Sequence, residues 1–113
     1  MLSWIGKGVI NLRKMILGLC EGRHDLPSEV EGYIFGKELT LDFDSLEDIC
    51  CDKLLECNEL ILYVTGFTPA LTTVISFCVH NSIPLTLMHY NRDTNEYVKQ
   101  IMWVVGYSRI EIG

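Results

Sequence analysis

The chain has 113 residues and a formal net charge of −6, so it has the size of one domain with a modest core. Hydrophobic residues make up 49% and charged residues 21%, the balance of an ordinary globular protein. The acidity argues against binding of duplex nucleic acid, which depends mainly on neutralising phosphates with Lys and Arg. A small anionic ligand is not excluded, because it needs only a few local cations and backbone N–H groups.

Residues 1–14 are expected to be an N-terminal appendage, either a tail packed on the surface or the product of an upstream start codon. Lys7, Asn11, Arg13 and Lys14 interrupt this segment, which is too short to span a membrane. The domain itself is expected to occupy residues 15–113.

The first strand is predicted at Met15–Cys20, a short apolar run typical of a buried parallel strand. After it, Ser28 is expected to cap a short helix, with Glu31 at the capping-box position. Lys37–Phe43 alternates apolar and polar residues, which indicates a half-buried strand at a sheet edge or an extended connection.

A second helix is predicted over Ser45–Cys57. Ser45 is the expected N-cap, Asp48 stands at the capping-box position, and Asn58 is a plausible left-handed terminator. The spacing of the apolar residues forms one helical stripe: Leu46, Ile49, Cys50, Leu54 and Cys57.

The segment that follows has the pattern strand, turn, helix, strand. Leu60–Val64 is a buried strand, Gly66 ends it, and Thr68 is the expected N-cap of a helix with Pro69 in its first turn. Pro84–Met88 begins the next strand. Strand, helix and strand within about 30 residues form a βαβ unit, whose strands are parallel and whose crossover is right-handed. The helix stripe is Leu71, Val74, Ile75, Cys78 and Val79.

The C-terminal part is predicted to form an antiparallel hairpin. A polar turn at 91–95 separates the preceding strand from Glu96–Val105, and Tyr107–Ile112 is expected to add a last short strand. The whole pattern predicts an α/β fold: a small Rossmann-like, mostly parallel sheet flanked by helices, with a C-terminal antiparallel hairpin extension.

The five cysteines are expected to be reduced thiols of a cytoplasmic protein. Their number is odd, no C-x-x-C motif occurs, and no secretory signal is found. A metal site would need closely spaced Cys and His ligands, which the sequence lacks. No G-x-G-x-x-G or Walker A motif occurs, so we expect no metal and no cofactor.

Ligands of open parallel sheets bind beyond the carboxyl ends of the strands. Three such ends carry polar residues, and adjacent parallel strands would bring them to one rim. The turn at 65–70 opens a helix whose free N–H groups would suit an anion, although the same turn also makes a sound structural helix start. The candidate ligand-binding residues are Gly22, Asp25, Thr65, Gly66, Phe67, Thr68, Ala70, His89, Tyr90, Asn91 and Arg92.

Arg23 and His24 directly follow a buried strand and are the candidate catalytic residues, although an exposed loop histidine is an equally valid interpretation. The economical reaction for such a site is phosphodiester cleavage without a metal. A ribose 2′-hydroxyl would attack in line, His24 would act as general acid or base, and Arg23 or Arg92 would stabilise the phosphorane. For His89, a hydrogen-bonded core histidine is the structural alternative, and Arg92 is solvated unless a phosphate is present.

The motifs at residues 22–27 and 65–70 resemble those of small CRISPR-associated ring nucleases and cyclic-oligoadenylate-binding proteins, relatives of the CARF ligand-sensing fold. That family places a polar motif with His after the first strand and a Gly/Pro-containing turn before a later helix. The resemblance covers roughly Met15–Tyr90. It implies a homodimer that binds a cyclic nucleotide second messenger across its two-fold axis and either cleaves or sequesters it.

Two other function classes stay open. One is a small acidic interaction or inhibitor protein, for example a phage anti-defence protein, which would recruit a protein partner through the exposed half of Glu96–Trp103. The other is a small enzyme acting on a phosphate-bearing metabolite. Under every reading we expect a homodimer, because so small a domain with many aromatic residues tends to bury some in a symmetric contact.

Overall fold

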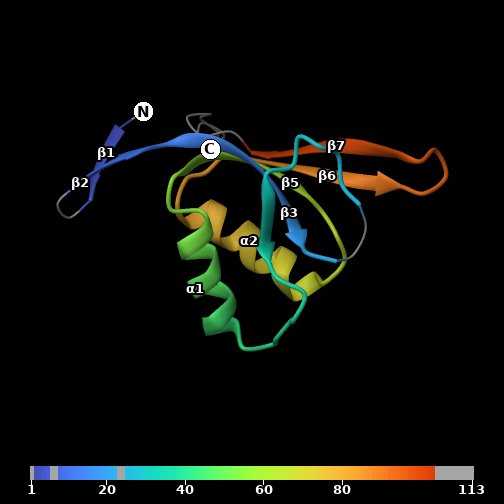
Figure 1. Cartoon of the computed structure of the whole chain (residues 1–113), viewed down its shortest axis with the longest axis horizontal. Coiled ribbons are helices and arrows are strands. Elements are labelled where there is room, and N and C mark those ends of the chain that lie inside the picture. Colours follow the sequence, from blue (N-terminus) through green and yellow to red (C-terminus); the bar gives the residue numbers. More distant parts are fainter. Residues whose placement is uncertain (1, 6–7, 23–24, 104–113) are drawn as a thin grey trace, which may run out of the picture.

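The computed structural model describes residues 2–5, 8–22 and 25–103. Figure 1 shows a twisted sheet with two helices packed beneath it. In chain order the elements are β1 (Leu2–Ile5), β2 (Gly8–Asn11), β3 (Arg13–Cys20), β4 (Gly32–Phe35), α1 (Phe43–Lys53), β5 (Cys57–Tyr63), α2 (Thr68–His80), β6 (Leu85–Asn91) and β7 (Glu96–Trp103).

The main sheet has the strand order β4-β3-β5-β6-β7. Strands β4, β3, β5 and β6 run parallel, and β7 pairs antiparallel with β6. The predicted βαβ unit is confirmed as β5, α2 and β6, and the predicted hairpin is confirmed as β6 and β7. The fold is therefore α/β, with a mixed, mostly parallel five-stranded sheet.

The core lies between the sheet and the helices. Leu19, Leu60 and Leu62 are fully buried at the centre of the sheet, and Val74 and Cys78 of α2 are fully buried against it. Continuous apolar strands are what a sheet interior requires, which is why the apolar runs of the sequence located β3, β5 and β6.

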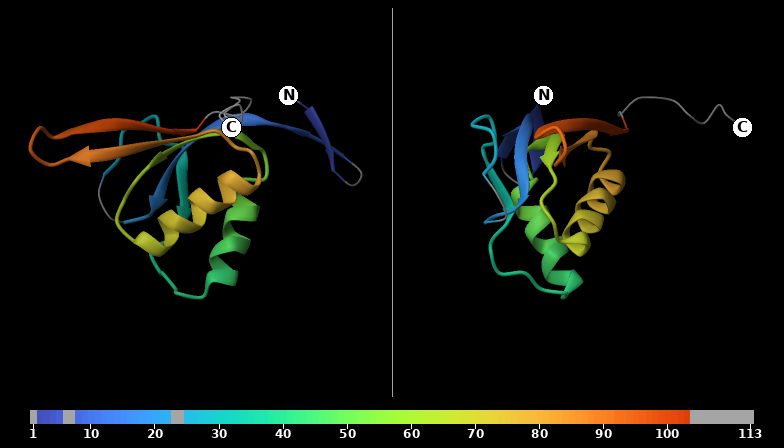
Figure 2. Two further views of the ribbon diagram at one scale, coloured as in Figure 1. Left: turned by 180° about the vertical axis from the view of Figure 1, so that it is seen from behind. Right: turned by 90° about the vertical axis from the view of Figure 1, so that its right-hand side faces the viewer.

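Both helices lie on one face of the sheet, as the two views of Figure 2 show. Crossovers between parallel strands are right-handed, so the connection from β3 to β4, which runs toward the other edge of the sheet, belongs on the opposite face. Leu26 of this connection indeed lies over Gly18 of β3, whose neighbours Leu17 and Leu19 point into the core. The second face is thus crossed by a loop instead of a helix.

The N-terminal residues form a separate antiparallel ribbon of β1 and β2. The ribbon lies at the end of the molecule opposite the β6–β7 turn (Figure 1). It leads directly into β3, which begins at Arg13 and so includes the last residues assigned to the appendage. The predicted last strand, at residues 107–112, lies outside the described residues.

The predicted helix after Ser28 is wrong. The segment makes a single turn, in which Val30 N donates to Pro27 O at 3.0 Å, and then enters strand β4. The Glu31 carboxylate, expected in a capping box, instead accepts a hydrogen bond from Ile16 N at 3.1 Å and pairs with Arg13 at 2.9 Å. Strand β4 takes the edge position. The segment predicted as an edge strand or an extended connection forms no strand: it bends at residues 37 and 38, and Phe43 begins α1.

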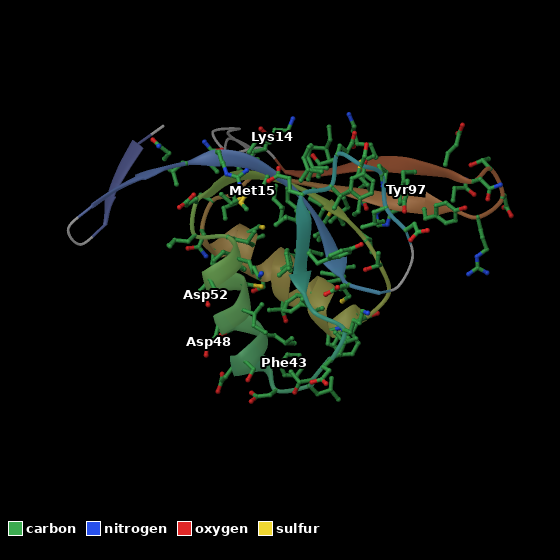
Figure 3. All side chains as sticks on the ribbon, in the orientation of Figure 1. Lys14, Met15, Phe43, Asp48, Asp52 and Tyr97 are labelled. Atoms are coloured by element: carbon green, nitrogen blue, oxygen red, sulfur yellow. The ribbon has the colours of Figure 1, made fainter. Side chains whose placement is uncertain are left out.

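The predicted boundaries of both helices also need correction. Helix α1 begins two residues before Ser45, because Asp42 is its N-cap and accepts hydrogen bonds from the backbone N–H groups of Asp44 and Ser45. The helix is capped at its C-terminal end by Leu54, so the predicted terminator Asn58 belongs to β5. Its acidic side chains Asp48 and Asp52 face outward (Figure 3).

Helix α2 has Phe67 as its N-cap instead of Thr68, and no side chain caps it. Pro69 stands in the first turn as predicted. Asn81 is the C-cap, in agreement with the predicted end of the helix.

Candidate functional site

A cleft of about 300 Å³ opens at the carboxyl ends of β3 and β4. Its lining combines two carboxylates, one ammonium group, one aromatic ring and the backbone of one glycine: Glu21, Asp25, Lys37, Tyr33 and Gly22. The volume is at the lower end of the range of about 300–1,000 Å³ that is usual for ligand pockets. The cleft therefore suits a ligand of the size of one nucleotide.

The backbone of the cleft is fixed by the pairing of β3 with β4. Cys20 pairs with Phe35 at the end of the ladder, and Glu21 N continues it by donating to Phe35 O at 3.0 Å. Gly22 then turns the chain in the left-handed region, at φ +83°, where glycine has no steric penalty. The stem of Lys37 lies against Gly22, with Cγ 3.2 Å from the position of a β-carbon there. A larger residue at position 22 would strain the turn and displace Lys37.

Tyr33 of β4 pairs with Gly18 of β3, and its ring occupies the space that a side chain at residue 18 would need. A β-carbon at residue 18 would lie 2.7 Å from Tyr33 Cδ1 and 2.6 Å from Leu26 Cδ1. The ring and the loop thus pack directly on the β3 backbone. This close packing fixes one wall of the cleft.

A second contact holds the loop on this face of the sheet. The buried Tyr63 donates a hydrogen bond from its hydroxyl to Glu29 Oε2 at 2.5 Å. Burial, and then the Glu29 carboxylate, raise the pKa of Tyr63 to about 12, so the hydroxyl keeps its proton at neutral pH. Tyr97 of β7 (Figure 3) packs edge-on against Tyr63, with ring centroids 4.8 Å apart. The tyrosines and Glu29 therefore anchor the loop whose start borders the cleft.

The charges in the cleft are not neutralised by one another. Within the part of the chain that the structure describes, no carboxylate lies close enough to Lys37 for an ion pair, and the one ion pair found there joins Arg13 to Glu31. That pair lies at the opposite end of β3, where the hydrogen bond from Arg13 lowers the pKa of Glu31. The ammonium group and both cleft carboxylates are exposed to solvent.

Of the residues predicted as a site, Gly22 and Asp25 line the cleft. Arg23 and His24, the predicted catalytic pair, lie outside the described residues. The sequence analysis did not identify Tyr33 and Lys37 as site residues. Tyr33 belongs to β4, a segment for which a helix was predicted, and Lys37 follows this strand. The β-forming run of residues 32–35 was the available signal.

The predicted turn at 65–70 lies at the end of β5, next to the end of β3, but none of its residues lines the cleft. Thr65 is fully buried; its hydroxyl accepts a hydrogen bond from Cys20 N at 2.9 Å and donates one to Cys20 O at 3.0 Å. The N–H of the buried Ala70 donates to Phe67 O at 3.0 Å, within the first helical turn. Gly66 and Thr68 are exposed. Thr65 thus connects the end of β5 to β3, so its side chain has a structural role and not the predicted contact with a ligand.

None of the residues predicted at the end of β6 lines the cleft. The pairing of β5 with β6 ends near Met88, and β6 continues for three residues as a ribbon with β7, about 10 Å at the usual rise of a strand. His89 Nε2 lies 2.7 Å from Gln100 Oε1 on β7, and Tyr90 donates to Asn95 Oδ1 at 2.8 Å. Asn91 Oδ1 accepts from Asp93 N within the turn, and Arg92 is exposed. Of the three strand ends that were expected to form one rim, only the end of β3 contributes residues to the cleft, and its partner there is β4.

A second, mostly apolar cavity of about 370 Å³ lies near the C-terminal ends of the two helices. It offers few polar groups to orient a ligand. Its lining residues are Leu12, Cys51, Leu54, Leu55, Cys57, Phe77, Asn81 and Ile83.

Comparison of the chain with family models, with curated proteins and with solved structures gave no match. Among the described residues, no group of three or more His, Cys, Asp or Glu side chains is arranged to hold a metal ion. None of the helices in residues 2–5, 8–22 and 25–103 is long and apolar enough to cross a membrane. The function must therefore be argued from the site.

Proposed function

We propose that the protein binds a cyclic oligonucleotide second messenger, such as a cyclic oligoadenylate, at the carboxyl end of its parallel strands. The observation that carries this proposal is the cleft at the ends of β3 and β4, which joins an aromatic ring, an exposed ammonium group and a left-handed glycine turn. Aromatic rings stack on bases, and ammonium groups attract phosphates.

The strand order supports a Rossmann-like reading of the domain. The connection after β3 leaves on one face of the sheet, whereas the connection after β5 leaves on the other through α2. Such a reversal between adjacent strands is where open α/β sheets bind ligands. The loop that starts at Glu21 borders both this point and the cleft.

We propose that the active form is a homodimer. One cleft has room for about one nucleotide unit, so a ring of several nucleotides needs more than one cleft. Two copies related by a two-fold axis would present two identical clefts to a ligand with matching symmetry. None of the five cysteines, all of them among the described residues, is joined in a disulfide, which suits the reducing cytoplasm in which we propose that the dimer acts.

If the ligand is cleaved, we propose attack of a ribose 2′-hydroxyl on the adjacent phosphorus. The O2′–P bond forms and the P–O5′ bond breaks, leaving a 2′,3′-cyclic phosphate and a 5′-hydroxyl. The proton leaves the 2′-oxygen and a proton reaches the 5′-oxygen, so no further reactant is consumed. His24 is the proposed acid or base, and Arg23 the proposed partner of the phosphorane charge.

Incubation of the protein with cyclic oligoadenylates of three, four and six units tests both versions of the proposal. Unchanged ligand recovered from a tight complex indicates sequestration, linear product indicates an enzyme, and absence of binding to all of them refutes the proposal. His24→Ala should abolish cleavage and spare binding. His80→Ala is the matched control, because His80 is exposed near the far end of α2 and should leave both unchanged.

The exposed edge of β7 favours a second candidate function, the recruitment of a protein partner. Val98, Ile101 and Met102 are 51%, 61% and 37% exposed on β7, which is the last strand of the sheet formed by the described residues. Exposed edges pair readily with a strand of another chain. Native mass spectrometry distinguishes pairing of β7 with a second copy of the chain from pairing with another protein. A homodimer that Ile101→Lys disrupts indicates that the β7 edge serves self-association. A monomer indicates that the edge is available to a different partner.

A further inference from the structure

The charged groups of the cleft among the described residues differ in the hydrogen bonds that they can form with a ligand. A carboxylate, as at Glu21 and Asp25, accepts hydrogen bonds, whereas an ammonium group, as at Lys37, donates them. A ligand that satisfies both must donate hydrogen bonds at one end and carry negative charge at the other. A nucleotide with an amino-bearing base has this polarity.

The cleft also separates these groups in space. The stem of Lys37 lies against Gly22, whereas Leu26, next to Asp25 in the chain, lies with the Tyr33 ring over Gly18. Asp25, which lines the cleft, thus directly precedes the residue that packs beside the ring, whereas the stem of Lys37 lies where the chain turns at Gly22. A base stacked on Tyr33 would direct its edge toward a carboxylate and its phosphate toward Lys37.

We infer that the cleft selects adenine and cytosine nucleotides, by donation from the exocyclic amino group of the base to the Asp25 carboxylate. Adenine and cytosine offer such a donor at the position where thymine offers a carbonyl acceptor, which a carboxylate rejects. Tyr33 supplies the stacking surface and Lys37 the contact to phosphate. This inference rests on the proposed function and specifies the ligand class of that site.

Titration of the isotopically labelled protein with AMP and with IMP, followed by NMR, tests it. The two nucleotides differ at the base edge, where the amino group of AMP is a carbonyl in IMP. We expect AMP to bind about tenfold more tightly, with the largest shift changes at Gly22 and Tyr33. Asp25→Asn, which adds a donor, should reduce this preference to less than about threefold. Glu38→Gln is the matched control, because Glu38 is exposed and does not line the cleft, and it should keep the full preference.

Two further variants separate the roles. Tyr33→Leu should weaken AMP and IMP equally, because stacking does not depend on the amino group. Lys37→Met should reduce the advantage of AMP over adenosine. Equal binding of AMP and IMP by the unmodified protein would overturn the inference and leave nucleotide binding intact. Failure of both nucleotides and of the cyclic oligoadenylates to bind would overturn the proposed function itself.

Discussion

Replacing Thr65 by valine tests whether this residue serves the fold or a ligand. The sequence made Thr65 a candidate ligand contact, whereas the structure uses its buried hydroxyl for two hydrogen bonds to the Cys20 backbone, of 2.9 and 3.0 Å. Valine keeps the shape of the side chain and removes both bonds. Losing a buried hydrogen bond costs about 1–2 kcal/mol, so we expect Thr65→Val to lower the free energy of unfolding by about 3 kcal/mol.

Thr65→Ser provides the control, because it keeps the hydroxyl and removes one methyl group. Its expected cost is about 1 kcal/mol. Urea unfolding followed by circular dichroism at 222 nm measures both. With a slope near 1.5 kcal/mol per molar urea, the midpoint should fall by about 2 M for the valine variant and by less than about 1 M for the serine variant.

Equal stability of the two variants would refute the structural role of the hydroxyl. A second readout removes the remaining ambiguity. Folded Thr65→Val protein should bind nucleotide as the unmodified protein does, because Thr65 does not line the cleft. Loss of binding without loss of stability would return Thr65 to the ligand site.

Three further outcomes follow from burial and packing. Of the five thiols, Cys51 alone is exposed, so Ellman's reagent should modify one thiol per native chain quickly and all five in denaturant. Burial raises the pKa of Cys78 from 9.0 to about 12, so between these pH values the native thiol keeps a proton that the unfolded chain loses. The contribution of this thiol to the free energy of unfolding is therefore complete below pH 9 and declines toward pH 12, by about 2 kcal/mol at pH 10.5. Urea titrations at several pH values measure this decline, which should be smaller in Cys78→Ala. Gly18→Ala would place a β-carbon 2.7 Å from the Tyr33 ring and should destabilise the fold by about 1–3 kcal/mol, whereas Gly36→Ala, with open space around it, should change the urea midpoint little.

The elements that the sequence located are those whose own residues carry the signal. A parallel strand buried on both faces is a continuous apolar run, and β3 and β5 have no competing interpretation. Helix α2 was located by its stripe, although one member of the stripe, Val79, proved 55% exposed. Helical periodicity marks the buried face of a helix but does not state how wide that face is.

The error at Ser28 shows where local patterns fail. Ser28 and Glu31 have the spacing of a capping box, and that motif competes with any other use of the same side chains. Here the Glu31 carboxylate accepts a hydrogen bond from Ile16 N and pairs with Arg13, both distant in the chain. The contacts that select a strand over a helix at this point belong to β3, and no inspection of residues 28–36 alone reveals them.

This error also explains the part of the candidate site that was missed. Without β4, the sequence analysis expected the end of β3 to meet only the ends of β5 and β6. With β4 in place, β3 has neighbours on both sides, and the cleft opens on the side of the unrecognised strand. Tyr33 and Lys37 enter the site through that pairing alone.

The topology gives a reason for the cleft to lie at this point. A right-handed connection from β3 to β4 must cross the face of the sheet that the helices leave open. The described residues of this connection form no helix, and it packs through single contacts, Leu26 on Gly18 and Glu29 on Tyr63. A loop fixed at its middle and at its far end leaves its near end, at the carboxyl edge of β3, unfilled by side chains of the core. The β3–β4 connection is thus a loop instead of a helix on this face of the sheet, and the loop leaves room for a ligand beside the strand ends.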